Sequence, residues 1–210
     1  MRAKRMPEQA RREMILRAAF EVARREGIGG LTVRAVATEA RVSHALVLFH
    51  FGRKEQLIHD LLDRVIDATA VLHISEDIAR FPHARDRLHA VLQQEMARLS
   101  HQPEQTRLFL EYWALGARNE EFRTRISEEL DRYRAAFQSI MEEMVSAEPA
   151  AFAGASADGL AAVAVSWVHG CAVQAMIDPA HFDTDEYLAA VRGLIGRPGE
   201  GVTWGRSVNY

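Results

Sequence analysis

Apolar residues recur along this 210-residue chain at intervals of three and four, and no stretch alternates apolar and polar residues convincingly. Such spacing gathers apolar side chains on one face of a helix. The first stripe predicts a helix from about Glu8 to Glu26, which Gly27 and the glycines after it end. Its members are Ile15, Leu16, Ala19, Phe20, Val22 and Ala23. We therefore expect an all-α protein.

Two short helices and one long helix should follow. Thr32 and Ser43 are good N-cap residues, because their hydroxyl oxygens can accept a hydrogen bond from the backbone of the first turn. The residues between the two short helices, 40–42, suit a tight turn. The predicted helical ranges are about 33–39, 44–49 and 53–72.

Prolines divide the rest of the chain at helix starts and stops, because proline cannot continue the hydrogen bonding of a helix interior. They are Pro82, Pro103, Pro149 and Pro179. The predicted helices are about 82–99, 104–116, 119–146, 155–177 and 184–196. We expect a small domain over residues 1–52 and a larger helical domain over 53–210, with the helix from about residue 53 connecting them.

The net charge of −3 conceals an asymmetry along the chain. Residues 1–56 hold 12 Lys+Arg and 6 Asp+Glu, a balance of +6, whereas residues 57–210 hold 14 and 23, a balance of −9. A basic head on an acidic body places the anion-binding surface at the N-terminal end. Nucleic acid or an anionic membrane is the expected partner.

Composition and cysteine usage exclude several classes of protein. Hydrophobic residues make up 48% and charged residues 26%, which is ordinary for a globular chain and excludes disorder as the main state. The single cysteine, Cys171, excludes an internal disulfide and a thiolate zinc cluster. The basic N-terminus is not followed by an apolar segment, so we expect no signal peptide and a cytoplasmic protein.

The two short helices and their three-residue turn fit a helix-turn-helix. In such a unit the start of the second helix meets base edges in the major groove. Ser43 and His44 supply hydrogen-bonding groups there, and Ala45 is small enough for close approach. Lys54 lies in the first turn of the long helix, where a cation opposes the helix dipole, and a nearby phosphate would supply a reason for it.

The stretch from Thr32 to Leu57, TVRAVATEARVSHALVLFHFGRKEQL, strongly resembles the DNA-binding domain of the TetR family of transcriptional regulators. The ending LFHFGRKEQL is its most specific part, and the resemblance extends back to Arg12. A weaker similarity covers the body. Glu111–Ile126 and Gly170–Phe182 look like the C-terminal domain of the betaine-regulator-like branch.

The resemblance implies a role for several residues in holding DNA. His50 and Lys54 match phosphate-contacting positions, Thr32 matches a backbone-contacting cap, and Arg34 lies where side chains reach bases or phosphates. The predicted DNA-binding residues are Thr32, Arg34, Ser43, His44, Ala45, Phe49, His50 and Lys54.

The chain departs from the family pattern at three places. Leu48 and Phe49 stand where the family commonly has Tyr, so a hydroxyl contact to phosphate is missing. Arg41 stands where the turn usually has Gly, and a left-handed conformation there costs arginine about 1–2 kcal/mol relative to glycine. These changes suggest greater reliance on Arg34, His44 and the basic N-terminal arm, which could lie in the minor groove.

Residues Leu160–Ile177 are almost uninterruptedly apolar and reach the length of a membrane helix. Polar side chains in the middle of the run and an aspartate at each end favour a buried helix instead. The resemblance implies a homodimer in which the last two helices of each subunit form a four-helix bundle. We therefore predict dimer burial and no membrane partner. The predicted interface residues are Val163, Trp167, Gly170, Gln174, Leu188 and Val191.

The resemblance also implies a small-molecule inducer in a cavity among the middle helices. Glu111 and Trp113 together could hold a cation by charge and cation–π attraction, and His169 is a second polar anchor. The predicted ligand-binding residues are Phe109, Glu111, Tyr112, Trp113, Phe122, Tyr133, Phe137 and His169. Aromatic residues at helical spacing are often plain core, and that alternative stays open for each of them.

No signature of an enzyme appears in the chain. It has no Glu-x-x-His pair for a di-iron site, no phosphate-binding glycine loop and no Gly-x-Ser-x-Gly motif. We expect no enzyme, no cofactor and no metal site. The fold expected is an N-terminal three-helix helix-turn-helix DNA-binding domain joined to a larger helical ligand-binding and dimerisation bundle.

The function predicted is that of a ligand-responsive homodimeric transcriptional regulator, most readily a repressor. It would bind a palindromic double-stranded DNA operator and be released by a small-molecule inducer. The alternative is a basic-headed helical adaptor that binds a membrane or a protein without sequence-specific DNA binding.

Overall fold

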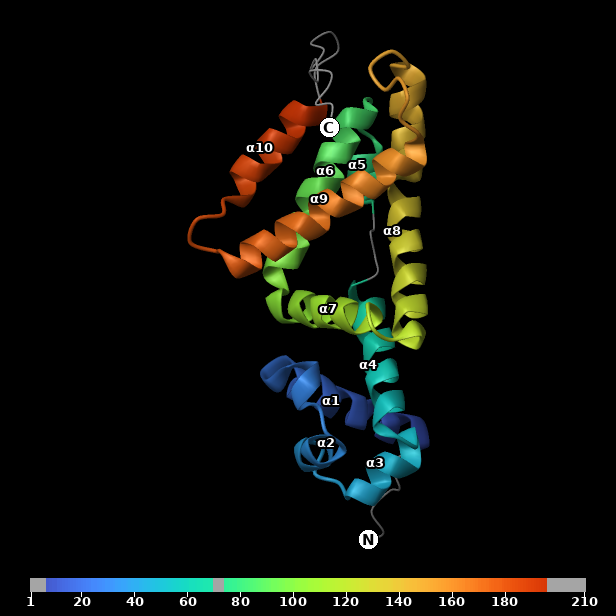
Figure 1. Ribbon diagram of the computed structural model, residues 1–210, viewed down its shortest axis with the longest axis vertical. Coiled ribbons are helices and arrows are strands. Elements are labelled where there is room, and N and C mark those ends of the chain that lie inside the picture. Colours follow the sequence, from blue (N-terminus) through green and yellow to red (C-terminus); the bar gives the residue numbers. More distant parts are fainter. Residues whose placement is uncertain (1–6, 70–73, 196–210) are drawn as a thin grey trace, which may run out of the picture. The chain divides into compact units, whose positions relative to one another are not determined.

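The computed structural model describes residues 7–69 and 74–195, and the secondary structure in these ranges is helical throughout (Figure 1). The all-α expectation is confirmed. The helices are α1 Glu8–Gly30, α2 Val33–Glu39, α3 His44–Phe51, α4 Lys54–Thr69, α5 Glu76–Ala79, α6 Ala84–His101, α7 Pro103–Gly116, α8 Glu120–Ala147, α9 Ala157–Ile177 and α10 Thr184–Ile195.

The sequence pattern placed most helix ends within three residues, and the differences have local causes. α3 continues through His50 and Phe51, because the first residue with a positive φ is Gly52, at 71°. Gly27 (φ 74°, ψ 173°) breaks α1 as expected, but one more turn follows it to Gly30. The four-residue α5 was not predicted, since it is too short to show a period. The predicted extension of α4 to residue 72 lies outside the described residues.

The chain divides into two compact units, which are described separately. Unit 1 comprises Met1–Val71 and Gln102–Leu130, and unit 2 comprises Leu72–His101 and Asp131–Tyr210. Unit 1 therefore holds the helix-turn-helix together with α7 and the first part of α8. The division into a DNA-binding domain over 1–52 and a ligand-binding domain over 53–210 stays a prediction.

Tertiary packing must hold α2 and α3 in place. They have seven and eight residues, and helices this short are not stable alone in water. Val36 of α2 and Val47 and Phe51 of α3 are buried against α1 and α4. α7 completes the same core with Leu108 and Tyr112, both fully buried, so residues far along the chain support the helix-turn-helix.

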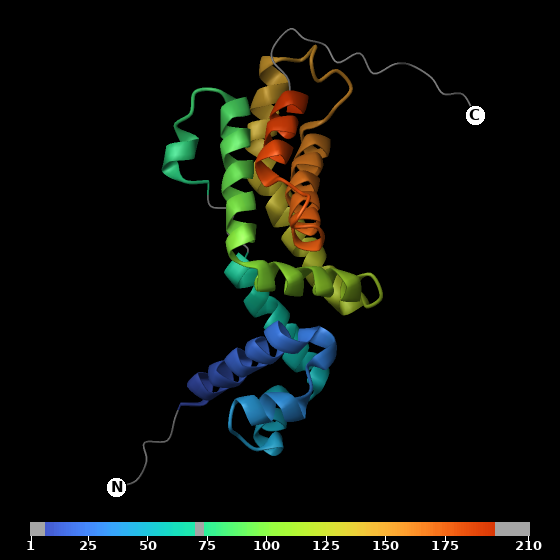
Figure 2. The same cartoon turned by 90° about the vertical axis from the view of Figure 1, so that its left-hand side faces the viewer.

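Unit 2 is built from α5, α6, the later part of α8, α9 and α10. Figure 2 shows α6, α8, α9 and α10 side by side, and α6 contacts both α9 and α10. Leu88, Leu92 and Met96 of α6, Phe137 of α8 and Val168 of α9 are almost completely buried.

Candidate functional site

The caps of α2 and α3 set the start of each helix. Thr32 Oγ1 accepts a hydrogen bond from Ala35 N at 3.1 Å, and Ser43 Oγ accepts one from Leu46 N at 3.1 Å. Both predicted caps are confirmed. Between the helices Arg41 has a φ of 54°, the left-handed conformation expected there, which is strained for any residue with a Cβ.

The outer side of α3 presents an unusual set of exposed groups. His44 and Ala45 are exposed at its first turn, and Phe49 keeps 75% of its surface while its neighbours Val47 and Phe51 are buried. His50 is half-buried, with the Phe49 ring set edge-on to it at a centroid distance of 5.2 Å. The exposed Phe49 ring therefore adds an apolar part to this surface.

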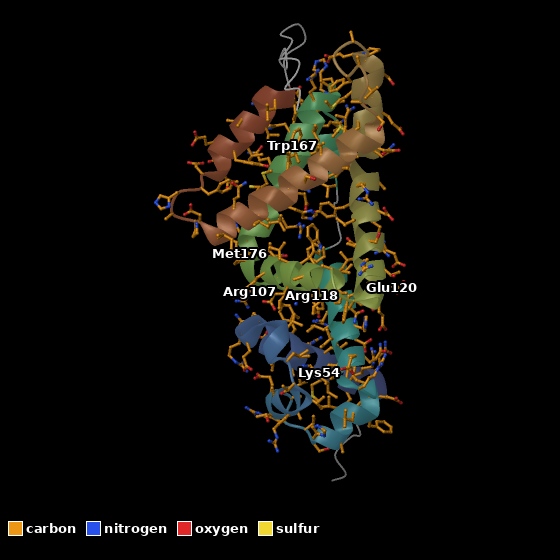
Figure 3. All side chains as sticks on the ribbon, viewed as in Figure 1. Lys54, Arg107, Arg118, Glu120, Trp167 and Met176 are labelled. Carbon is orange, nitrogen blue, oxygen red and sulfur yellow. The ribbon has the colours of Figure 1, made fainter. Side chains whose placement is uncertain are left out.

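Several cations of this region differ in whether a carboxylate pairs with them. Arg12, Arg17, Arg24 and Arg25 of α1 each pair with a carboxylate. Arg34 on α2 and Lys54, the first residue of α4, have no carboxylate partner among the described residues. Figure 3 labels Lys54. We call the predicted DNA-binding residues, Thr32, Arg34, Ser43, His44, Ala45, Phe49, His50 and Lys54, the recognition surface.

Arg12 shows that not every basic residue near the N-terminus is available to a partner. Its guanidinium forms an ion pair with Asp60 of α4 and lies 5.0 Å from the centroid of the Phe51 ring. Arg12 therefore fastens α1 to α3 and α4. The more N-terminal part of the predicted basic arm, residues 1–6, lies outside the described residues.

The end of α1 is held by α7. Glu111 Oε2 accepts a hydrogen bond from the backbone N–H of Ile28 at 2.6 Å. This approach needs the glycine at position 27, because a Cβ there would lie 3.0 Å from the same oxygen. Arg107 donates to the carbonyl oxygen of Arg24, and Arg24 pairs with Glu104 at 3.0 Å (Figure 3). We call these contacts between α7 and the end of α1 the α1–α7 junction.

Removing the Glu111 carboxylate should destabilise unit 1. In Glu111→Ala the buried Ile28 N–H loses its acceptor, which costs about 1–3 kcal/mol of the free energy of unfolding. Glu111→Gln keeps a carbonyl oxygen and should recover most of the loss. Urea unfolding measures both, with Glu104→Ala as a control, because the exposed pair that Glu104 makes is worth less than about 1 kcal/mol. Equal stability of Glu111→Ala and wild type would contradict this role.

Several predicted ligand-binding residues belong to the core of unit 1. Tyr112 is fully buried, donates a hydrogen bond from its hydroxyl to Ile58 O at 3.0 Å, and has its pKa raised well above the usual value by burial. Phe122 stacks on His59 with ring centroids 4.0 Å apart. The two rings therefore hold α7 and α8 to α4, and a role for them in ligand binding stays a prediction.

A groove of about 610 Å³ lies in unit 1 and was not expected from the sequence. Its lining residues are Arg12, Glu13, Leu16, Phe20, Asp60, Asp63, Arg64 and Gln105. The charges in it are already compensated, because Arg12 pairs with Asp60, Arg64 with Glu13, and Asp63 with Arg125. The groove therefore offers a ligand no uncompensated charge.

Unit 2 contains a buried polar cluster, formed by Glu95 and Arg98 of α6, Tyr133 of α8 and His169 of α9. Glu95 is completely buried, and its Oε2 accepts hydrogen bonds from Arg98 Nη2 at 2.7 Å and from the Tyr133 hydroxyl. The rings of Tyr133 and His169 are stacked, with centroids 5.5 Å apart. Burial, followed by the charge of Arg98, lowers the pKa of His169 to about 4.

Sequence reasoning missed Glu95 and Arg98, although a signal was present. The apolar stripe of the helix over 82–99 runs through Leu88, Val91, Leu92 and Met96, and Glu95 occupies a position on that stripe. A carboxylate there must be buried with a partner. The partner, Arg98, is the basic residue three positions on, within the reach of helical side chains.

One face of α9 is unusually open. Val163, Trp167, Gly170 and Gln174 recur at intervals of four, three and four, which places them on one side of the helix. Val163 is 42% exposed, and a Cβ added at Gly170 would meet nothing within 4 Å. Figure 3 labels Trp167 on this helix. We call these four residues the α9 face.

Two of the predicted interface residues on α10 do not share this exposure. Leu188 and Val191 are 6% and 2% exposed, because they pack inside unit 2, so neither is available to a second copy. The large apolar residue exposed on α10 is Leu194. By length and composition, α9 is the one helix among the described residues that could cross a membrane, with 33% of its apolar window buried in the protomer.

Known proteins are similar to this chain in sequence and in fold. Residues 15–61 match the profile of bacterial regulatory proteins of the tetR family, and residues 84–197 match that of the C-terminal part of BetI-type transcriptional repressors. The chain is 31% identical over 186 residues to an uncharacterized HTH-type transcriptional regulator in the dhlA 5′ region of Xanthobacter autotrophicus, covering 85% of this chain and 86% of the relative. The chain belongs to the TetR family.

Solved structures of transcriptional regulators have the same fold. One from Pseudomonas aeruginosa PAO1 superposes with a TM-score of 0.72 at 22% identity, covering 91% of this chain and 93% of that one. One from Saccharomonospora viridis, in complex with choline, gives 0.68 at 18% identity, with coverages of 90% and 96%. The expected fold, a helix-turn-helix joined to a helical C-terminal domain, is confirmed.

As a member of the TetR family, the chain is a DNA-binding transcription regulator, and its family and fold are not those of enzymes. The recognition surface lies within the range that matches the family's DNA-binding part. The predicted ligand-binding residues divide between the units. Phe109, Glu111, Tyr112, Trp113 and Phe122 lie in unit 1, whereas Tyr133, Phe137 and His169 lie in unit 2.

Glu111 is not available as the predicted anchor for a cation beside Trp113, because its carboxylate holds the Ile28 amide and faces Arg107 at 3.6 Å. Phe137 is fully buried in the core of unit 2. Phe109 and Trp113 are half-buried, with their rings 5.6 Å apart. His169 and Tyr133 are the predicted residues that lie together in a polar setting.

The buried His169 should make the stability of this TetR-family chain depend on pH. Its folded-state pKa, about 4, is below its ordinary value of 6.5, so between these values the unfolded chain binds a proton that the folded chain does not. Stability from this group is complete above pH 6.5 and falls as the pH drops towards 4, by about 3 kcal/mol in total. In urea unfolding of His169→Gln between pH 4 and 7, the free energy of unfolding should lack this part of its dependence on pH. Parallel pH profiles for variant and wild type would contradict it.

Proposed function

We propose that this TetR-family regulator is a homodimeric repressor in the cytoplasm that binds a palindromic operator through the recognition surface and is released by a small molecule. The observation that carries the proposal is the pairing pattern of the cations. Arg12, Arg17, Arg24 and Arg25 of α1 are held by carboxylates, while Arg34 and Lys54 beside α3 have no such partner among the described residues. Cations left uncompensated beside an exposed recognition helix suit a phosphate backbone.

The α9 face supports the dimer. A helix that is apolar all round needs burial on every side, yet Val163 and Val173 of α9 are 42% and 38% exposed in the protomer. Gly170 leaves room for a second helix to approach closely. A two-fold dimer carries two recognition helices, and a palindromic site matches that symmetry.

The α1–α7 junction supports release by a ligand. α7 holds the end of α1 through Glu111 and holds α4 through the Tyr112 hydroxyl, and α4 carries Lys54 at its start. A ligand that shifts α7 or α4 would therefore move groups that hold DNA. The half-sites lie about 34–36 Å apart, so a shift of a few ångströms prevents both helices from docking. A tenfold loss of operator affinity requires about 1.4 kcal/mol of coupling.

Two substitutions on the recognition surface test the proposal. Lys54→Ala should weaken binding to all sequences alike and lower the slope of log K against log salt by about one per site contacted. His44→Ala should change the preference among operator variants by about 1–3 kcal/mol at one base position. Fluorescence anisotropy with genomic fragments selected by the wild-type protein measures both effects over a range of salt concentrations.

Arg80→Ala serves as the control, because Arg80 is an exposed cation in unit 2, paired with Glu76 and Asp77. It should change neither the salt slope nor the preference among sites. Equal losses on every sequence for His44→Ala and Lys54→Ala would remove His44 from the base-reading residues. Failure of the wild type to select any DNA site, together with binding to anionic vesicles, would favour the adaptor alternative.

A further inference from the structure

The polar cluster of unit 2 contains a buried hydrogen-bond donor that has no acceptor, Arg98 Nη1. An arginine side chain has five N–H donors. In Arg98 the Nε donates to Glu95 at 3.1 Å, and Nη2 reaches Glu95 at 2.7 Å and the Tyr133 oxygen at 3.1 Å. Nη1 is buried and has no hydrogen-bond partner among the described residues. A buried donor without an acceptor is uncommon in native proteins.

Glu95 and Tyr133 do not satisfy that donor. The Glu95 oxygens face Arg98 Nε and Nη2, and Glu95 Oε2 also accepts from the Tyr133 hydroxyl. The Arg98 side chain as a whole is 21% exposed, while its Nη1 atom is buried. The acceptor that Nη1 lacks can therefore come from a bound molecule.

The charge of the cluster restricts what that molecule can be. Glu95 and Arg98 compensate each other at 2.7 Å, and His169 is uncharged at neutral pH because its pKa is about 4. A cation would meet the positive charge of Arg98, while the Glu95 carboxylate already faces Arg98 and Tyr133. A carboxylate would add an uncompensated negative charge next to the buried Glu95. An uncharged oxygen acceptor satisfies Nη1 without either cost.

We propose that the inducer of this regulator is an uncharged, mainly apolar molecule whose carbonyl oxygen accepts hydrogen bonds from Arg98 Nη1. The proposal rests on the proposed function, because it names the ligand class of the site that releases DNA. The rest of the molecule would pack against the aromatic side of the cluster, where the rings of Tyr133 and His169 are stacked. The ligand class therefore differs from the cation choline that the structure from Saccharomonospora viridis contains.

A matched series of four small molecules on one phenyl scaffold tests the ligand class with the full chain. Acetophenone presents an uncharged carbonyl, ethylbenzene has no acceptor, benzoate is an anion and benzyltrimethylammonium is a cation. Ligand-observed NMR titration gives a dissociation constant for each compound. In protein-observed spectra, the imidazole resonances of His169 report whether the compound lies at the cluster. Acetophenone should bind at least about tenfold more tightly than each of the other three, the factor expected for one hydrogen bond to a charged group.

The double variant Glu95→Met/Arg98→Met removes both charges together, so no uncompensated charge is left buried. It should bind acetophenone and ethylbenzene equally, with the ethylbenzene affinity close to that of wild type. Asp131→Ala/Arg134→Ala is the matched control, because it removes an exposed pair of the same three-residue spacing from α8. The control should keep the full preference for acetophenone.

Three results would overturn the proposal. They are equal binding of acetophenone and ethylbenzene by wild type, tighter binding of benzoate or benzyltrimethylammonium, and binding of none of the four compounds up to their solubility limits. If the double variant has no stable fold, the wild-type series and the shifts at His169 still decide the matter. Operator binding is measured separately, so loss of the compound preference in a chain that still selects its operator refutes the ligand class and leaves the DNA-binding function in place.

Discussion

Replacing Gly170 by arginine is expected to give a folded monomer whose operator affinity is at least about 10³-fold below that of wild type. The protomer itself tolerates the change, because a Cβ at Gly170 would meet nothing within 4 Å. In a dimer, the new side chain would place an unpaired charge between two apolar helices. A monomer holds only one half-site, so its binding should approach the non-specific level, which is typically 10³-fold or more weaker.

Sedimentation velocity and operator titration measure the two halves of this prediction. Ala135→Arg on α8 is the control, because it adds the same charge at an exposed position away from the α9 face. The control should remain dimeric and keep its operator affinity. A wild-type chain that sediments as a stable monomer and still binds a half-site tightly would refute the dimer argument.

Replacing Arg98 alone by methionine should be among the most destabilising single changes in unit 2. Glu95 is completely buried, and without Arg98 its carboxylate keeps the hydrogen bond from the Tyr133 hydroxyl but loses its compensating charge. Removing one partner of a buried pair costs about 3–5 kcal/mol of the free energy of unfolding, because the other charge is left uncompensated. The double variant Glu95→Met/Arg98→Met should lie within about 1 kcal/mol of wild type or above it, since apolar replacement of a whole buried pair is often neutral.

Urea unfolding of wild type, the single variants Glu95→Met and Arg98→Met, and the double variant gives the coupling energy between the two residues. The exposed pair Asp131 and Arg134 supplies the comparison, and its removal should cost less than about 1 kcal/mol. Additive losses from the two single changes would show that Glu95 and Arg98 act independently, against the geometry of the cluster.

The helix-turn-helix could be predicted closely from the sequence because its signals are local. The hydroxyls of Thr32 and Ser43 act within one turn, and both caps lie where they were expected. Arg41 takes the left-handed conformation that the turn requires, since residues 40–42 must reverse the chain in three steps. The spacing of apolar residues predicted the longer helices, because a period of 3.6 residues is visible in any helix with one buried face.

The candidate ligand-binding residues could not be assigned in this way, because an aromatic side chain on an apolar face looks the same in a core and in a cavity. Tyr112 and Phe122 turned out to pack against α4, and Glu111 to hold a backbone amide 83 positions earlier in the chain. Leu188 and Val191 likewise had the right period for an interface but are buried inside unit 2. Which side of a helix meets which neighbour is a property of the packed chain.

The sequence by itself determined the all-α class, the helix-turn-helix and the family, because each depends on residue types at short and fixed spacing. Only the tertiary structure decided that α7 completes the core beneath the helix-turn-helix, and that Glu95, Arg98, Tyr133 and His169 meet in one buried cluster. Those residues come from three helices, α6, α8 and α9, and are up to 74 positions apart along the chain. Hydrogen bonds and burial act through space at a few ångströms, so no local pattern in the sequence encodes which distant side chains they join.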